Sequence, residues 1–434
     1  MRSLDAYLNR RKVGTLHEGD DLWGFEYDAE WMQAIDGFDL APGLPRAQQR
    51  HLDGASRRTV QWYFDNLLPE ETLREAVTKE AGIVGDDAFA LLAYLGAESA
   101  GSLVLLPPGH PIAGQGGVVP LPDGALCQRI RNLPRTTLGS GAPKRMSAAG
   151  AQHKLLVVYR DGMLFEPVGA EPSTHILKPN HPSGDYPASV INEYFCMRLV
   201  QAVLGDGPAV HRRYTPEPVY LVERFDRYVD AEGNTQRRHI VDACQLLGKS
   251  RSFKYQTASV ATLAEIVGHC RNRAITRMRL FSWLVFNVLI ANDDNHLKNL
   301  SFLVTHEGVA LAPWYDLLST GSYRTRAFAE ERATWPAVDM MVPLPGASRF
   351  GEVTRNAVLQ AGEVLGVPRR LAERELDRIA TEMGKAVPRL VDAIGLENAS
   401  HPKAAHPYLA GEMRLLRTLQ HLVIPEMLGR VARD

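Results

Sequence analysis

The spacing of apolar residues changes along the first quarter of the chain. Short apolar stretches predict strands at 7–8 and 22–27, with a turn at 13–15. Between 57 and 95 the apolar residues recur at helical spacing, which predicts helices that share one core. The residues expected in that core are Leu67, Leu68, Leu73, Ala76, Val77, Leu91, Leu92 and Leu95.

A stretch rich in proline and glycine follows. Residues 107–124 contain five prolines and five glycines, which predicts a linker or an irregular loop. Beyond it, strands are expected at 154–159, 163–166, 174–178 and 219–225, and the first two would form a hairpin. One helix is expected from Val190 to Leu204, with Gly205 at its carboxyl end. This part of the chain therefore reads as a small sheet with one helix.

The pattern becomes mostly helical from about residue 229. Helices are expected at 275–288, 353–365, 369–396 and 411–429, and a hairpin at 300–312 is the exception. The pattern predicts a bilobal α+β protein with a β-rich N-terminal lobe and a mostly helical C-terminal lobe. The expected divisions are 1–106 for an N-terminal subdomain, 107–228 for the N-terminal lobe and 229–434 for the C-terminal lobe.

Composition narrows the class of protein. The 434 residues include 49 basic and 50 acidic ones, a net charge of −1, whereas a dedicated nucleic-acid wrapper is usually strongly basic. Hydrophobic residues make up 45% of the chain, so it should fold. The four cysteines lie far apart without a CxxC pair, which suits a reducing cytoplasm. With no signal peptide and no membrane-spanning run, we expect a soluble cytoplasmic protein.

Residues 292–316 carry the most informative chemistry. Asp294 and Asn299 are five residues apart, a hairpin follows, and Asp316 comes after its second strand. Phosphoryl transfer needs a carboxylate that orients the attacking hydroxyl, and an amide oxygen and second carboxylate that hold Mg²⁺. Protein-kinase catalytic loops use this order and approximate spacing. The alternative is a polar loop that caps a helix, with Asp and Asn chosen for turns.

The preceding segments supply further candidates. Lys178 ends an apolar strand, where a phosphate-binding lysine would sit, although a solvated edge-strand lysine is the alternative. Glu193 lies early in the next helix and could pair with Lys178, or it could lie on a solvated helix face. The small residues of 147–154 form a loop whose N–H groups could cradle phosphate oxygens. His296 has no partner at metal-ligand spacing, so we expect it to order its loop and not to bind zinc.

Several segments together resemble the HipA family of serine/threonine kinases, the toxin half of bacterial toxin–antitoxin pairs. Residues 57–106 resemble the family's N-terminal subdomain. The further matching blocks, all in the family's order, are SAAGAQHKLLV (147–157), THILKP (174–179), NEYFCMRLV (192–200), VERFDR (222–227), NDDNHLKNLSFL (292–303) and LAPWYDLLST (311–320). The resemblance therefore extends over nearly the whole chain.

The resemblance implies a role for each matching residue. Asp294 would be the catalytic base, and Asn299 and Asp316 would hold Mg²⁺. Ser147 matches the serine that family members autophosphorylate, which ejects the loop and switches the kinase off. Glu223, Arg224 and Phe225 would form the hinge beside the adenine. The other residues expected to contact ATP are Ala149, Gly150, Ala151, Gln152, His153, Lys154, Lys178 and His296.

The resemblance also implies a fold and a function. The fold would be bilobal and protein-kinase-like, with a β-rich N-terminal lobe, an extra N-terminal subdomain and an all-helical C-terminal lobe. The chain would transfer the γ-phosphate of Mg-ATP to a protein serine or threonine, and family targets include aminoacyl-tRNA synthetases. Its partner would be a HipB-like helix-turn-helix antitoxin, through which it would reach operator DNA, and no membrane is implied. Two alternatives stay open. One is an ATP-binding co-repressor partner of the antitoxin with weak kinase activity, and the other is a different ATP-dependent transferase on the same fold.

One departure from the family pattern lies beside the expected base. Asp293 precedes Asp294 and adds a charge there. If both carboxylates face the metal, Mg²⁺ would bind differently, and if Asp293 points away nothing changes. None of the core catalytic residues is missing, so a pseudokinase is not indicated.

Overall fold

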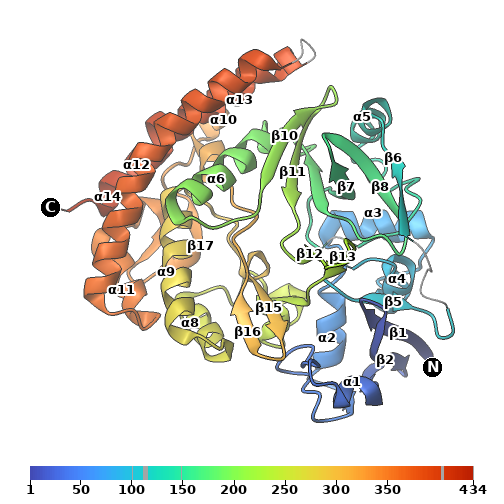
Figure 1. Cartoon of the computed structure of the whole chain (residues 1–434). Coiled ribbons are helices and arrows are strands. Elements are labelled where there is room, and N and C mark those ends of the chain that lie inside the picture. Colours follow the sequence, from blue (N-terminus) through green and yellow to red (C-terminus); the bar gives the residue numbers. More distant parts are fainter. Residues whose placement is uncertain (100, 111–115, 148, 402–404, 434) are drawn as a thin grey trace. The chain divides into compact units, whose positions relative to one another are not determined.

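The structure is a computed structural model that describes residues 1–99, 101–110, 116–147, 149–401 and 405–433. The chain is of mixed α and β structure, as predicted, and it forms two compact units (Figure 1). Unit 1 consists of Met1–Lys178, Leu221–Phe253 and Ser301–Ala312, and unit 2 of Pro179–Tyr220, Lys254–Leu300 and Pro313–Asp434. The division of the chain into three domains stays a prediction.

Unit 1 begins with an antiparallel sheet in the order β4-β3-β2-β1-β5. Its strands are β1 (Arg2–Leu8), β2 (Arg11–Gly19), β3 (Leu22–Tyr27), β4 (Arg50–Leu52) and β5 (Val104–Leu106). The turn expected at 13–15 is wrong, because these residues lie inside β2 and pair with β1. The two-residue turns fall instead at Asn9-Arg10 and Asp20-Asp21, where all four residues have positive φ, as type I′ hairpin turns require.

Four short helices accompany this sheet in unit 1. They are α1 (Ala29–Gln33), α2 (Thr59–Asp65), α3 (Glu71–Ala81) and α4 (Ala88–Leu95). The six leucines predicted for the core between 67 and 95 are all buried. Ala76 and Val77 are only half-buried on α3. The helical spacing therefore identified the core of this region correctly apart from these two residues.

A second sheet in unit 1 follows the order β11-β9-β7-β8-β6. Its strands are β6 (Gly116–Pro120), β7 (Leu155–Arg160), β8 (Met163–Gly169), β9 (His175–Pro179) and β11 (Pro218–Glu223), of which Leu221–Glu223 belong to unit 1. The irregular loop expected at 107–124 is wrong for β6, which pairs antiparallel with β8. Residues 111–115 lie outside the described residues. Helix α5 (Asp123–Arg131) follows β6.

Short strands interrupt the region after residue 229, so the prediction of an all-helical C-terminal lobe is wrong in this respect. The predicted hairpin is confirmed as β15 (Ser301–Thr305) and β16 (Gly308–Leu311), and β14 (Ile240–Asp242) pairs with β15. The other strands are β12 (Arg227–Val229), β13 (Thr235–Arg237), β17 (Asp339–Leu344) and β18 (Ala347–Arg349). Each of these strands pairs only with a near neighbour in the sequence. Three of them, β12, β13 and β18, have only three residues, which is too short to show an alternating pattern.

Helices dominate unit 2. They are α6 (Ser189–Leu204), α8 (Val260–His269), α9 (Arg273–Leu289), α10 (Arg326–Ala329), α11 (Arg355–Val364), α12 (Arg369–Ser400), α13 (His406–Thr418) and α14 (Ile424–Val431). Helix α6 packs against α12 and α13, and most of its residues are buried. Its predicted end at Gly205 is confirmed, since Gly205 takes the left-handed conformation with φ 67°.

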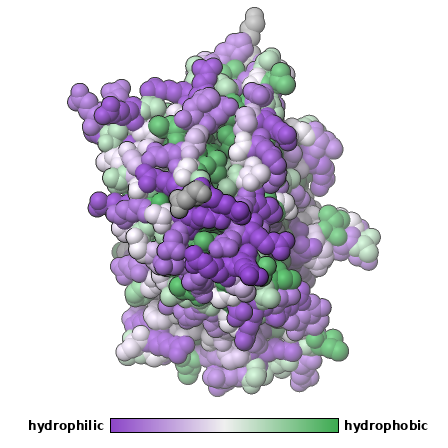
Figure 2. Space-filling model, turned by 90° about the vertical axis from the view of Figure 1, so that its left-hand side faces the viewer, coloured by the Kyte–Doolittle hydropathy of each residue, from purple (hydrophilic) through white to green (hydrophobic). Residues whose placement is uncertain are grey.

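The outer face of unit 2 that carries α12 is turned to the viewer in Figure 2. Hydrophilic side chains dominate this face, and its hydrophobic residues are scattered in small groups. Ion pairs on α12, such as Arg369 with Glu363 and Lys385 with Glu382, account for part of this polar surface. Within the described residues, no helix is both long and apolar enough to cross a membrane.

Candidate active site

Two buried asparagines hold the polar loop that follows α9. Asn287 Nδ2 donates to the Trp283 carbonyl at 2.8 Å, and Asn292 Nδ2 donates to Asn287 Oδ1 at 2.8 Å. Asn292 Oδ1 then accepts the Asp294 N–H at 3.0 Å. The chain reverses at Ala291, where φ is 52°. The backbone of Asp294 is therefore fixed by an amide chain that runs back into the buried helix.

The loop brings Asn299 onto Asp294, as the five-residue spacing predicts. Asn299 Nδ2 donates to the Asp294 carbonyl at 2.8 Å, and the His296 N–H donates to the same carbonyl at 2.9 Å. Because the amide nitrogen of Asn299 is used in this bond, its oxygen is the atom presented to a ligand. The His296 ring packs edge-on against Tyr255 at 5.0 Å. His296 therefore takes part in ordering the loop through its backbone, and its contact with ATP stays a prediction.

Asp316 stands in a strained conformation near the same loop. Its φ is 58°, which non-glycine residues seldom adopt and which costs on the order of 1–3 kcal/mol. The preceding residue, Tyr315, donates its hydroxyl to the Lys298 carbonyl at 2.8 Å. This bond ties the segment that carries Asp316 to the loop that carries Asn299. Strained residues of this kind cluster at functional sites.

Asn192 on α6 anchors the chain just after Asp316, a role that no sequence pattern predicted. Its Oδ1 accepts the Ser319 N–H at 2.8 Å, and its Nδ2 donates to the Ser319 carbonyl at 2.9 Å and to the Tyr323 hydroxyl at 3.0 Å. Asn192 has no exposed surface. A buried amide needs partners, so the position of Asn192 among the buried residues of α6 explains these bonds.

Asp293 lies beside a threonine and an arginine of the same unit. Its N–H donates to Thr320 Oγ1 at 2.6 Å. Burial raises the pKa of the Asp293 carboxyl, although a hydrogen bond from Thr320 and the charge of Arg324 oppose this rise. The carboxylate that departs from the family pattern is therefore held by groups that follow Asp316 in the chain.

Glu193 is buried in unit 2, and Glu193 and Asp316 both lie near Tyr220. Glu193 is 3% exposed, so the alternative of a solvated helix face is wrong. The pKa of the Tyr220 phenol is raised well above its ordinary value, first by burial and then by the negative charges of Glu193 and Asp316. The charges of Glu193 and Asp316 therefore both act on the Tyr220 phenol. The pairing of Glu193 with Lys178 stays a prediction.

Lys178 and Ser147 lie in unit 1. Lys178 is 5% exposed on β9, an inner strand between β11 and β7, so the alternative of a solvated edge-strand lysine is wrong. Ser147 is 2% exposed, and its hydroxyl donates to the Leu67 carbonyl at 2.6 Å. Its N–H donates to the Glu98 carbonyl at 2.7 Å. The serine expected to be phosphorylated is therefore held by residues of the N-terminal region.

The loop expected to cover the phosphates is held in the same way. The Glu70 N–H donates to the Gly150 carbonyl at 3.3 Å, and Lys154 Nζ donates to the Ala149 carbonyl at 2.5 Å. Gly150 has φ 99°, a conformation that only glycine adopts readily. Residue 148 lies outside the described residues. The roles of Ala149 to Lys154 in ATP binding, including those of Gln152 and His153, stay predictions.

The hinge arginine belongs to a buried ion cluster that no sequence pattern predicted. The Arg224 guanidinium bonds Asp226 at 3.0 and 2.7 Å, and the Arg224 N–H donates to the Thr174 carbonyl at 2.9 Å. Glu98, which is fully buried, is the centre of this cluster. Its carboxylate lies near four cations, namely Lys144 at 2.9 Å, Arg227 at 3.1 Å, Arg224 at 3.5 Å and Arg237 at 3.7 Å. The hinge roles of Glu223, Arg224 and Phe225 stay predictions.

The side chains of Asn299 and Asp316 fit a magnesium ion that is shared with phosphate. An amide oxygen and a carboxylate are ligands that Mg²⁺ prefers, and it usually takes only one or two protein carboxylates beside substrate phosphates. Across the described part of the chain, no group of three or more His, Cys, Asp or Glu side chains could hold a metal alone. Asn299 and Asp316 therefore suit Mg²⁺ by ligand type, and the binding of Mg²⁺ here stays a prediction.

Comparisons with known proteins point to one family. The family model "HipA-like C-terminal domain" matches residues 146–390, and "HipA N-terminal domain" matches residues 4–106. The chain is 35% identical to "Putative kinase Y4mE" of Sinorhizobium fredii over 74% of this chain and 78% of that protein. It is 31% identical to "Serine/threonine-protein kinase toxin HipA" of Shewanella oneidensis over 90% of this chain and 89% of that protein. The solved complex of Shewanella oneidensis HipA with HipB and operator DNA contains a chain that superposes with a TM-score of 0.77 and 26% identity, covering 99% of this chain and 100% of that one.

Proposed function

The chain belongs to the HipA family of serine/threonine protein kinases, and from this premise we propose that it transfers the γ-phosphoryl group of ATP to a serine or threonine of a protein. The observation that carries the proposal is the loop of unit 2. There Asn299 bonds Asp294, and the segment that carries the strained Asp316 is tied to the same loop through Tyr315.

The residues of the loop have distinct roles in this proposal. Asp294 orients the substrate hydroxyl and accepts its proton. Asn299 and Asp316 hold Mg²⁺, which neutralises charge on the phosphates when it is bound. Lys178 would contact the phosphates, and residues 149–154 would cover them, as the family resemblance implies. The anchoring by Asn292 supports this assignment, because positioning is most of what a kinase contributes to the reaction.

Ser147 is proposed as the site of autophosphorylation. Its hydroxyl is buried and bonded to the Leu67 carbonyl, so it must leave this position before it can accept phosphate. The known family targets lead us to propose an aminoacyl-tRNA synthetase as the substrate in trans. The proposed partner is a HipB-like helix-turn-helix antitoxin, because the Shewanella oneidensis HipA structure contains HipB and operator DNA. A net charge of −1 supports binding of DNA mainly through that antitoxin.

Incubation with γ-labelled ATP and Mg²⁺, followed by mass mapping, tests the proposal. We expect label on Ser147 in the wild type and none in Asp294→Ala, while ATP binding is kept. Asp392→Ala, on an exposed position of α12, is the matched control and should label normally. Normal labelling of Asp294→Ala would refute the assignment of the base. Transfer of label from α-labelled ATP would instead identify a nucleotidyl transferase.

A further inference from the structure

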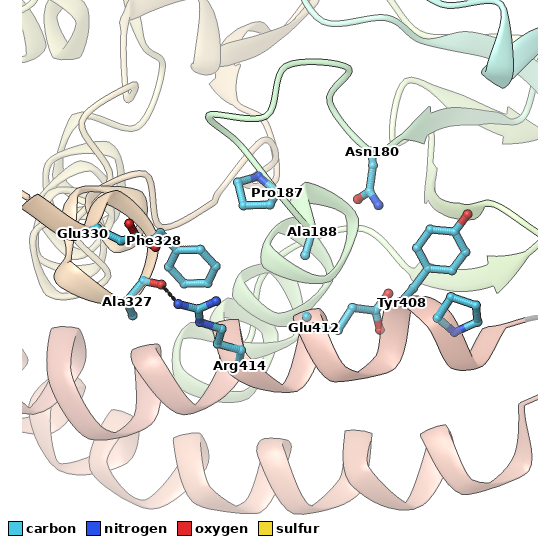
Figure 3. Close-up of a pocket in the computed structure, with 11 residues that line it drawn as sticks. Asn180, Pro187, Ala188, Ala327, Phe328, Glu330, Tyr408, Glu412 and Arg414 are labelled. Carbon is cyan, nitrogen blue, oxygen red and sulfur yellow. Dashed lines mark hydrogen bonds between the residues drawn. The ribbon is translucent and has the colours of Figure 1, made fainter. Parts of the chain in front are cut away.

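Unit 2 contains a pocket outside the proposed active site. It has a volume of about 360 Å³ and is lined by the segment before α6, by α10 and the residue after it, and by α13 (Figure 3). Ala188, Phe328 and Glu412 represent these three segments. None of the residues that the sequence assigns to ATP, metal or phosphorylation lines this pocket.

A buried carboxylate oxygen in this pocket has no partner. Glu412 is 1% exposed, and its Oε2 accepts bonds from Arg212 Nη1 at 2.8 Å and from the Tyr214 hydroxyl at 2.7 Å. Its Oε1 is buried without a hydrogen-bond partner among the residues that the structure describes. An unpaired buried acceptor costs about 1–3 kcal/mol, so such groups call for an explanation. Figure 3 shows the carboxylate above α13, between Ala188 and Tyr408.

The lining of the pocket carries two carboxylates and one cation, a net charge of −1 among the described lining residues. Glu330, which is exposed, is the second carboxylate and lies at the edge of the pocket. Arg414 is the one cation among these residues; its guanidinium donates to the Ala327 carbonyl and stacks over the Phe328 ring at 5.3 Å. The remaining surface includes Phe328 and two prolines, which suit the methylene groups of an aliphatic chain.

We propose that this pocket binds a guanidinium or ammonium group carried on an aliphatic chain. The N–H groups of such a cation supply the donor that Glu412 Oε1 lacks, and Glu330 adds a charge at the rim. Phe328 contacts the chain. The same chemistry comes from a basic side chain of a bound protein or from a free amine or guanidine, and the two sources are distinguishable by experiment.

Contacts within unit 2 lead from the pocket toward the loop of Asp294. The Phe328 ring packs edge-on against Tyr323 at 5.9 Å, and the Tyr323 hydroxyl accepts a bond from Asn192. Asn192 in turn holds Ser319, whose neighbour Thr320 accepts the N–H of Asp293. These contacts connect the pocket with the segment that holds the loop of Asp294, and the proposed binding itself rests on the pocket alone.

Isothermal titration calorimetry of the full chain without ATP tests the binding. The probes are n-butylguanidinium, the uncharged n-butanol of similar length, and inorganic phosphate. We expect n-butylguanidinium to bind, and the other two to show no heat of binding. Equal binding of n-butanol, or binding of phosphate in place of the cation, would overturn the proposal. Because no ATP is present, a chain without phosphotransfer would still bind the probe, so failure of the kinase proposal remains distinguishable.

Matched variants locate the site. Glu412→Gln should weaken n-butylguanidinium binding by about tenfold, and Glu330→Gln by about three- to fivefold, since one charge contact is lost in each. Glu331→Gln is the control, because Glu331 is exposed, follows Glu330 directly and does not line the pocket. Glu412 also bonds Arg212 and Tyr214, so its variant can be unstable. The exposed Glu330 has no such role, and unchanged affinity in Glu330→Gln would overturn the proposal.

A pair of pentapeptides separates the two sources of the cation. One has a central arginine and the other has citrulline, which keeps the shape and removes the charge. Tighter binding of the arginine peptide than of n-butylguanidinium would assign the pocket to a protein side chain. Equal affinity of those two probes would assign it to a free cation, and either result supports the shared chemistry. Equal affinity of the arginine and citrulline peptides would overturn it.

Discussion

Replacing Glu98 by glutamine tests whether the buried ion cluster holds unit 1 together. The cluster contains four cations (Lys144, Arg224, Arg227 and Arg237) and two carboxylates (Glu98 and Asp226), a net charge of +2. Glu98→Gln keeps the shape of the side chain but leaves those four cations with Asp226 alone, a net charge of +3. The glutamine also exchanges one acceptor oxygen for an NH₂ group, so either Lys144 or the pair Ser173 and Arg227 loses its acceptor.

The distances set the magnitude of this effect. At an effective dielectric constant of about 20, the attraction of Glu98 to Lys144 at 2.9 Å is about 6 kcal/mol, and to Arg227 at 3.1 Å about 5 kcal/mol. Desolvation of the fully buried carboxylate offsets much of this attraction. Removing one partner of a buried ion pair costs about 3–5 kcal/mol overall, and we expect Glu98→Gln to lower the free energy of unfolding by that amount.

The pKa values of the cluster give the pH dependence. Burial alone would raise the pKa of Glu98, but Lys144, Arg227, Arg237 and Arg224 together hold it well below its usual value of 4.5. A carboxyl with a lowered folded-state pKa contributes stability above its unfolded pKa, and this contribution is lost as the pH falls toward the folded pKa. The stability difference between wild type and Glu98→Gln should therefore be largest near pH 7 and should shrink below about pH 4.5.

Urea titrations followed by hydrogen exchange of peptides from β7 and β9 measure the stability of unit 1. Glu26→Gln is the control, because Glu26 pairs with Arg50 on the surface of the same unit, at 32% and 73% side-chain exposure. That control should lose no more than about 1 kcal/mol. If Glu98→Gln loses as little as the control, or if the difference does not shrink in acid, the reasoning about the cluster is refuted.

Three further predictions concern the loops around the active site. Asn192→Leu removes the bonds to Ser319, so it should lower the free energy of unfolding by about 2–4 kcal/mol and slow autophosphorylation at least tenfold. Its ATP affinity in calorimetry should stay within a few-fold of the wild type. The control Gln360→Leu, at an exposed position, should change neither stability nor rate. Burial raises the pKa of the Asp293 carboxyl, so the charged carboxylate destabilises the fold at pH values above the ordinary pKa of about 3.8. In urea titrations, Asp293→Asn should therefore be at least as stable as the wild type at pH 7. This advantage should disappear below about pH 3.8. Lower stability of Asp293→Asn at pH 7 would contradict this sign. Gly150→Ala should lower the free energy of unfolding by about 1–2 kcal/mol, because Gly150 has φ 99°, and it should speed hydrogen exchange of residues 149–154. Unchanged exchange would show that the turn tolerates a side chain.

Local spacing accounts for the part of the site that the sequence could predict. Asp294 and Asn299 lie in one loop, so their distance along the chain limits their distance in space, and the structure joins them by a hydrogen bond. The strands and helices with clear periods were also predicted, including α6 with its end at Gly205. The turn at Asn9-Arg10 was missed because it contains no glycine to mark its positive φ.

The features that the sequence could not predict depend on residues far apart in the chain. Glu98 meets Arg237, and Glu412 meets Arg212, only after folding. Each of these residues, taken alone, reads as an ordinary charged residue of the surface, which is where such residues are usually found. Their burial shows that this expectation is wrong for these residues, because a buried charge is stable only when it is paired with an opposite charge or hydrogen-bonded. The unpaired Oε1 of Glu412 is informative for the same reason.

The contacts of Ser147 give the N-terminal region a part in the proposed control of the kinase. The Ser147 hydroxyl and N–H bond to carbonyls of Leu67 and Glu98, and the neighbouring Gly150 carbonyl accepts the Glu70 N–H. All three partners lie within residues 4–106, the part matched by the HipA N-terminal domain. Phosphorylation of Ser147 therefore requires these bonds to break, and its phosphate cannot return to a place where the hydroxyl was 2% exposed without displacing Leu67.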